Sequence, residues 1–226
     1  MDIEHLILSP VGSRPADKAL TGVEESDADC VIVLVGSYAC AVKTVYERVR
    51  RRFGKRAAGR FRVFEHRFER SLGTGANGDH RTRLNDVARR VLRRIAGSEA
   101  PATVAEVVAT YSDVLRRLAS REGCDVLVFP EPNWTVVVER ANPGANRIFG
   151  EVRSAVKEVT DEHRLLWVDP NPAFAAAPDQ EALYMADGVH KTAEAHRMQA
   201  EIMTAAIQEA RLTAPERPAG ATASGP

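Results

Sequence analysis

The chain has 226 residues and a formal net charge of zero, with 31 lysines and arginines against 31 aspartates and glutamates. Zero net charge argues against nucleic acid as the main partner, because such binding is driven by neutralisation of phosphates. Hydrophobic residues make up 44% of the chain, which is enough for a sizeable core and excludes wholesale disorder.

The chain's cysteines and N-terminus suggest where the protein works. Cys30, Cys40 and Cys124 are far apart and odd in number, which favours reduced thiols over a disulfide framework. No His/Cys cluster has metal-ligand spacing, so we expect no metal. The N-terminus lacks the features of a signal peptide, and no run approaches the ~20 apolar residues that span a bilayer. We therefore expect a soluble, cytoplasmic protein with no membrane partner.

Apolar runs alternate with helical patterns along most of the chain. Residues 1–28 are polar and turn-rich, and residues 213–226 are rich in Ala, Pro, Gly and Ser, so we expect an N-terminal extension and a disordered tail around one domain at 29–212. The expected strands are 31–35, 61–65, 125–129 and 165–168. The expected helices are 40–53, 80–96, 102–121, 143–160 and 192–211.

This alternation predicts an α/β fold, a three-layer α/β/α sandwich with a central parallel sheet. The continuous apolar runs Val31–Val35 and Val126–Phe129 indicate strands buried on both faces. Ligands of such sheets bind at the carboxyl ends of the strands. Chemically active residues should therefore follow the expected strands.

Ser37 directly follows the first expected strand, after Gly36. A serine at this turn can expose its hydroxyl as a nucleophile, with its own N–H pointing into the same space. Taken alone, a serine here is more often a turn residue or a helix N-cap.

Two further loops could supply donors to an anion. Gly78, in the glycine-rich loop before the expected helix at 80–96, is our candidate for a backbone oxyanion donor. The plainer alternative is a flexible connection capped by Asp79. Asn133 follows the strand at 125–129, between two prolines and Trp134, and its amide could donate to an oxyanion or serve only in a turn.

Asp187 and His190 form the most specific pattern in the chain. The sequence Asp187-Gly188-Val189-His190 puts a carboxylate three residues before an imidazole, ahead of a long helical pattern. An aspartate can orient a histidine and stabilise its charged form while the histidine takes a proton from a hydroxyl. An isolated pair of this kind is more often a helix-cap arrangement.

The joint order of these pieces resembles the SGNH/GDSL hydrolases, a family of serine esterases, lipases and acyl hydrolases. The Asp-Gly-Val-His block and the helix behind it are similar to the family's Asp-Gly-x-His block, which implies Asp187 and His190 as the acid and base of a triad. Asn77-Gly78-Asp79-His80 is similar to the second block and implies Gly78 as an oxyanion donor.

Two blocks depart from the family pattern. Val35-Gly36-Ser37 stands where the family has Gly-Asp-Ser, and the match implies Ser37 as the nucleophile. Glu131-Pro132-Asn133-Trp134 matches Gly-x-Asn-Asp only at the Asn, which implies Asn133 as an oxyanion donor. Trp134 is then either a substrate platform or a lid over the core.

The resemblance implies a flavodoxin-like SGNH hydrolase fold and a reaction that needs no cofactor. The expected activity is cleavage of a carboxylic ester of a small molecule, lipid or acetylated sugar through an acyl-enzyme. An acyltransferase on the same fold, or a non-catalytic protein of this family, remains open, as does the oligomeric state. Two arginine-rich clusters, at 48–62 and 89–94, are read as solvated helix faces rather than as a nucleic-acid site.

Overall fold

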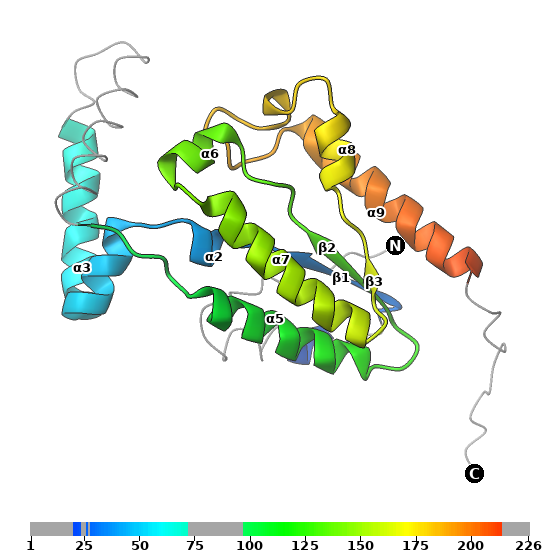
Figure 1. The fold of residues 1–226 in the computed structure, drawn as a ribbon. Helices are drawn as coiled ribbons and strands as arrows, with labels where there is room; N and C mark the ends of the chain where they lie inside the picture. Colours follow the sequence, from blue (N-terminus) through cyan, green and yellow to red (C-terminus); the bar gives the residue numbers. More distant parts are fainter. Residues whose placement is uncertain (1–19, 24–25, 27, 72–96, 214–226) are drawn as a thin grey trace.

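A parallel β-sheet forms the centre of the computed structural model, which describes residues 20–23, 26, 28–71 and 97–213 (Figure 1). In this part of the chain the strand order is β1 (Cys30–Val35), β2 (Asp125–Pro130) and β3 (Leu166–Trp167). The register pairs Val31 with Val126 and Leu127 with Leu166. The strands predicted at 31–35, 125–129 and 165–168 are confirmed, the last of them with only two residues.

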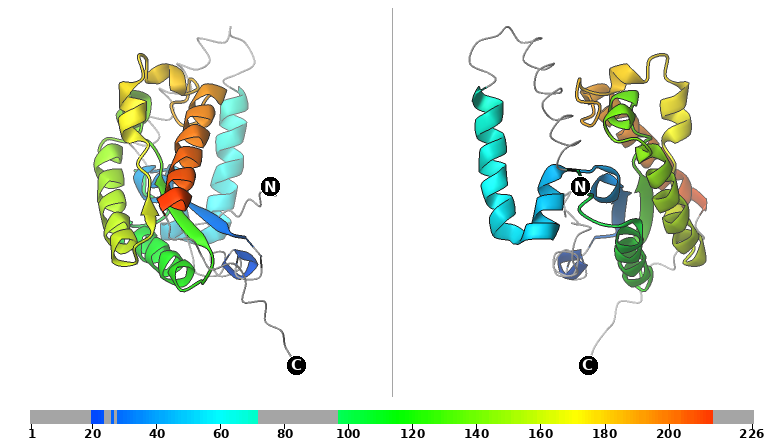
Figure 2. Two further views of the ribbon diagram at one scale, coloured as in Figure 1. Left: turned by 90° about the vertical axis from the view of Figure 1, so that its right-hand side faces the viewer. Right: turned by 60° about the vertical axis from the view of Figure 1, so that its left-hand side comes forward.

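Helices cover both faces of the sheet. α5 (Val104–Ala119) and α7 (Ala145–Glu162) pack against each other and against one face, and α9 (Ala193–Thr213) lies on the other (Figure 2). This confirms the α/β class with a central parallel sheet and helices on both sides. The sequence also predicted these three helices to within three residues at each end.

The sequence of α5 shows why this helix forms and which face it buries. Thr103 caps its N-terminus in a capping box with Glu106, so two backbone N–H groups of the first turn are satisfied. Its buried residues recur three and four positions apart, which places them on one stripe. They are Val107, Tyr111, Val114, Leu115 and Leu118.

The core lies between this stripe, α7 and one face of the sheet. Val33 and Val35 of β1 and Val126 and Val128 of β2 point into it. The other face of β1 differs from the prediction of a strand buried on both sides, because Ile32 and Leu34 are 43% and 51% exposed. In contrast, β2 is central to the described sheet and is buried on both faces.

The segment between β1 and α5 departs most from the predictions. The strand predicted at 61–65 is wrong, because these residues lie within α3 (Val45–Ser71), which stands apart from the sheet (Figure 1). A short stretch rich in apolar residues predicted a strand there, but the surrounding Arg, Lys, Glu and Ala residues favour a helix. The helix predicted at 40–53 is divided into α2 (Tyr38–Ala41) and α3, because Val42 is extended and Thr44 pairs with Glu99. The helix predicted at 80–96 lies outside the described residues.

Three short helices lie near the carboxyl ends of the strands: α6 (Val136–Ala141), α8 (Asn171–Ala176) and the 3₁₀ helix η1 (Glu181–Leu183) (Figure 1). Their connecting loops carry most of the predicted site residues. At the other end of the chain, Leu20 belongs to the main core although the sequence placed it in an N-terminal extension. Within the described residues, no helix combines the length and apolarity needed to cross a membrane.

Candidate active site

Ser37 lies at the turn between β1 and α2, where the sequence placed it. It occupies the N-cap position of α2, and its carbonyl accepts hydrogen bonds from the N–H groups of Cys40 and Ala41 at 3.0 and 2.8 Å. Its side chain makes no cap hydrogen bond. The hydroxyl instead accepts a hydrogen bond from the indole N–H of Trp134 at 3.1 Å, and Ser37 as a whole is 0% exposed.

Tyr111 of α5 fixes the backbone just before Ser37. Its hydroxyl accepts a hydrogen bond from the N–H of Gly36 at 2.9 Å and donates to the carbonyl of Leu34 at 3.2 Å. Burial raises the pKa of Tyr111, so the phenol stays neutral and able to donate. A core helix therefore holds the end of β1.

We expect Tyr111→Phe to lower the free energy of unfolding by ~1–3 kcal/mol, because the N–H of Gly36 loses its buried acceptor. Urea unfolding followed by circular dichroism measures this change. Tyr38→Phe is the matched control, because Tyr38 is 53% exposed. Equal stability of the two variants would mean that the Tyr111 hydroxyl does not support the turn.

The backbone of Trp134 is held by hydrogen bonds in the loop after β2. The backbone N–H of Trp134 donates to the side-chain oxygen of Asn146 at 2.7 Å, and its backbone carbonyl accepts from the side-chain amide of Asn146 at 3.0 Å. Its ring is tilted against that of Tyr38, with centroids 6.3 Å apart. The indole also packs against a small apolar cluster that includes Ala41 of α2. Trp134 thus covers the turn that carries Ser37.

Asn133 is exposed in the same loop, and its groups contact other segments. Its N–H donates to the side-chain oxygen of Asn171 at 2.9 Å, and its own side-chain oxygen accepts from Arg153 at 3.5 Å. Its carbonyl accepts from the hydroxyl of Tyr184 at 3.2 Å. Among the hydrogen bonds of the described residues, none joins Asn133 to Ser37.

Asp187 and His190 form a hydrogen-bonded pair. One carboxylate oxygen of Asp187 accepts from His190 Nδ1 at 2.5 Å, and the other accepts from the backbone N–H groups of Val189 and His190 at 2.9 and 3.0 Å. The hydrogen bond from the His190 side chain, aided by these two backbone N–H groups, lowers the pKa of Asp187 to about 2. The carboxylate is therefore ionised at neutral pH and orients the imidazole through Nδ1. The side chain of His190 is 73% exposed.

Asp187 and His190 lie in a hairpin of residues 184–191, which is closed by antiparallel pairing of Tyr184 with Lys191. This hairpin is docked on the loop after β2. The Thr135 hydroxyl donates to the carbonyl of Gly188 at 3.0 Å. Gly188 has φ of +70°, and a Cβ at this position would lie 2.3 Å from the Thr135 hydroxyl oxygen, so only glycine fits. Val189 packs on the same small cluster as Trp134. The close approach of Thr135 and the positive φ angle therefore explain why the Asp-Gly-Val-His pattern has glycine at position 188.

A second contact joins the hairpin to the same loop. The Tyr184 hydroxyl donates to the carbonyl of Asn133, and burial, with a smaller effect of the Glu131 carboxylate, raises the pKa of Tyr184 to about 12. The phenol therefore keeps its proton at neutral pH. The roles of Tyr184 and Thr135 could not be predicted from the sequence, because their partners lie 51 and 53 positions away.

The structure brings five of the six predicted site residues, all except Gly78, to one edge of the sheet. Trp134 contacts Ser37, and the next residue, Thr135, contacts Gly188. Gly188 lies between Asp187 and His190 in the sequence. Within the described residues, no hydrogen bond joins Ser37 to His190. Gly78 lies outside the described residues. In the same described part, no group of three or more His, Cys, Asp or Glu side chains is placed to hold a metal ion.

Comparison with solved structures finds likenesses that include two hydrolases. No family model and no curated protein matches the sequence. A lipase/acylhydrolase from Enterococcus faecalis is 19% identical, with a TM-score of 0.41 over 48% of this chain and 53% of that one. A mutant of Axe2, an acetyl-xylooligosaccharide esterase from Geobacillus Stearmophilus, is 14% identical, with a TM-score of 0.45 over 85% of this chain and 67% of that one. Thus the chain spans about half the length of the first protein and two thirds of the second. At such low identities and TM-scores, the likenesses do not define the chemistry of this site.

Proposed function

We propose that the chain is a serine hydrolase that cleaves a carboxylic ester of a small molecule, lipid or acetylated sugar through an acyl-enzyme. The supporting observation is the convergence of the Ser37 turn and the Asp187–His190 pair on one loop, residues 131–135, at the carboxyl edge of the sheet. Parallel sheets place their ligands at this edge.

The hydroxyl of Ser37 supplies the nucleophile in this reaction. His190 takes its proton while Oγ forms a bond to the ester carbonyl carbon. Asp187 holds the imidazole by its Nδ1 and stabilises its charged form. His190 then protonates the leaving alcohol, and water, deprotonated by His190, releases the acyl group and restores Ser37.

Negative charge develops on the carbonyl oxygen during the attack, and hydrogen-bond donors are needed to stabilise it. The N–H of Ser37 has no hydrogen-bond partner among the described residues, which supports it as one of them. The backbone N–H of Gly78 and the side-chain amide of Asn133 are the other proposed donors. We propose a small-molecule ester as the substrate, with no part for nucleic acid or a membrane in the reaction.

Trp134 controls access to Ser37 in this proposal. Ser37 is 0% exposed and its hydroxyl accepts from the indole N–H, so we propose that the ring moves aside to admit an ester. The displaced indole and the exposed Tyr38 ring then offer an aromatic wall to the substrate. We therefore propose that Trp134 takes part in substrate binding.

The proposal is tested with a fluorophosphonate probe and short p-nitrophenyl esters. The probe should form a covalent phosphonate at Ser37 with loss of fluoride, located by mass spectrometry of the digested protein. Ester hydrolysis should accompany this labelling. Neither labelling nor hydrolysis by folded protein would favour a non-catalytic role. A labelled acyl group that passes mainly to an added alcohol or amine would indicate an acyltransferase.

We expect Trp134→Phe to speed fluorophosphonate labelling of Ser37 by about 2–10-fold. The substitution keeps an aromatic ring but removes the N–H that holds the ring over the hydroxyl, and a hydrogen bond of this kind contributes about 0.5–1.5 kcal/mol to the closed arrangement. Stopped-flow or gel-based labelling rates measure the change. Trp167→Phe, in β3, is the control and should label at the wild-type rate. Slower labelling of Trp134→Phe would contradict the covering role of the indole.

A further inference from the structure

Glu131 and Lys191 form an ion pair between the loop after β2 and the histidine-bearing hairpin. Lys191 Nζ donates to Glu131 Oε2, and the two side chains are 12% and 29% exposed. Removal of either partner leaves a largely buried charge without compensation, which is costly. This contact spans 60 positions in the sequence and was not among the predicted site features.

Each partner of this ion pair lies next to a residue of the proposed reaction. The Glu131 N–H donates to the carbonyl of Val35, the last residue of β1, at 2.8 Å. A Cβ built on Gly36 would lie 3.8 Å from Glu131 Cγ, so the glutamate side chain runs beside the turn that carries Ser37. At the other end of the contact, Lys191 directly follows His190 in the chain.

The imidazole of His190 depends on its hairpin for its position. Its side chain is 73% exposed, and its hydrogen bond to Asp187 is made within the same hairpin. That bond orients the ring but does not fix the hairpin on the rest of the molecule. Contacts to residues outside the hairpin are needed for that, and the ion pair from Lys191 to Glu131 is a charged contact of this kind.

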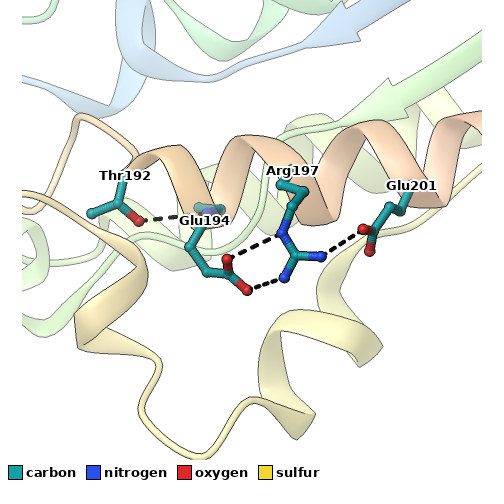
Figure 3. A network of polar contacts seen from close by, with 5 residues as sticks. Thr192, Glu194, Arg197 and Glu201 are labelled. Atoms are coloured by element: carbon teal, nitrogen blue, oxygen red, sulfur yellow. Dashed lines mark hydrogen bonds and ion pairs between the residues drawn. The ribbon is translucent and has the colours of Figure 1, made fainter.

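The chain after Lys191 is also fixed, so the ion pair acts at a defined point. Thr192 donates its N–H to the carbonyl of Leu183 at 3.0 Å, and its hydroxyl accepts from the N–H of Ala195 at 3.4 Å at the start of α9 (Figure 3). The Glu194–Arg197–Glu201 ion pairs of the next turns lie on the exposed face of α9 (Figure 3). They are surface contacts within one helix and do not reach the hairpin.

We propose that the Glu131–Lys191 ion pair is the positioning contact that sets where His190 stands relative to Ser37. This inference rests on the proposed function. The ion pair touches neither the substrate nor the reacting atoms; it ties the hairpin to the end of β1, one residue from each of the two groups that exchange the proton. A misplaced base slows the proton transfer more than it weakens substrate binding.

Steady-state ester hydrolysis by Lys191→Met and Glu131→Gln tests this inference. We expect kcat to fall about 10–100-fold in each variant, with KM within about twofold of wild type, because positioning acts on the chemical step. The double variant should be no slower than either single variant, since both remove the same contact. Lys191→Arg keeps the charge and should restore most of kcat. Wild-type kcat in Lys191→Met would overturn the inference.

Lys157→Met is the matched control, because Lys157 pairs with Asp161 at 2.6 Å on the exposed face of α7. Its kcat and its thermal unfolding should equal those of wild type. A similar loss of kcat in this control would mean that removal of any lysine ion pair has the effect, and would overturn the inference.

Hydrogen exchange separates this inference from the proposed function. In Lys191→Met, amide hydrogens of residues 184–191 should exchange at least about 10-fold faster than in wild type, with no change in Lys157→Met. Unchanged exchange would overturn the anchoring role of Lys191 whether or not the protein is an esterase. A wild-type protein that neither hydrolyses esters nor labels at Ser37, but shows faster exchange in Lys191→Met, would overturn the proposed function and leave the ion pair as an anchor of the hairpin only.

Discussion

Ser37→Ala is expected to abolish fluorophosphonate labelling and to lower kcat for p-nitrophenyl acetate by at least about 10⁴-fold. The loss is this large because the covalent step requires the hydroxyl oxygen, which no neighbouring side chain in the described part of the chain replaces. The adjacent Cys40 does not substitute for it, since burial raises the pKa of its thiol to about 11 and keeps the thiol protonated. Intact-mass spectrometry after probe treatment, together with initial rates, measures the effect.

The control for Ser37→Ala is Ser154→Ala, an exposed position on α7. It should label and hydrolyse as wild type does. Circular dichroism should show that Ser37→Ala is folded, with a loss of about 1–3 kcal/mol in unfolding free energy because the Trp134 N–H loses its acceptor. Retained labelling in folded Ser37→Ala would remove Ser37 as the nucleophile.

His190→Ala is expected to lower kcat by about 10³–10⁶-fold, because Ser37 then has no general base. Asp187→Asn should lower kcat by about 10²–10⁴-fold, since an amide neither fixes the Nδ1–H tautomer nor stabilises the imidazolium. Initial rates with a short p-nitrophenyl ester measure both. His196→Ala, an exposed position on α9, is the control and should keep wild-type activity.

The pKa of Asp187 adds a pH signature to this experiment. The pKa is about 2 in the folded protein, below its ordinary value of 3.8, so the ionised carboxylate stabilises the fold above about pH 4. That stabilisation is lost as pH falls from 3.8 towards 2. The difference in urea midpoint between wild type and Asp187→Asn should therefore shrink as the pH falls from about 4 towards 2. A difference that grows over this acidic range would contradict the assigned partner.

The regular elements could be predicted where the pattern of hydrophobic residues is strong. β1 and β2 are continuous apolar runs, and α5 has buried residues at helical spacing with a capping box at its start. The prediction of a strand at 61–65 was wrong because a short stretch rich in apolar residues is compatible with either a strand or a helix. Exposure of Ile32 and Leu34 could not be predicted either, since the sequence does not state which strand lies at the edge of the described sheet.

The contacts of the candidate site differ in how far apart their residues lie in the sequence. Asp187 and His190 are three residues apart, so a turn alone brings them together, and the spacing was sufficient to predict their contact. Trp134 covers Ser37 across 97 positions, a relation that no local pattern expresses. Its identity as an aromatic residue was visible, but its role over the hydroxyl was not.

By itself, the sequence determined the strands β1 and β2, the helix stripes that cover them and the Asp187–His190 pair, because each depends on residues within a few positions of one another. Only the tertiary structure decided that Trp134 covers Ser37 and that Glu131 anchors the hairpin through Lys191. Those contacts depend on the order of strands in the sheet and on the docking of one loop upon another. Such arrangements minimise exposed apolar surface and unpaired charge over the whole chain, so a local stretch of residues does not specify them.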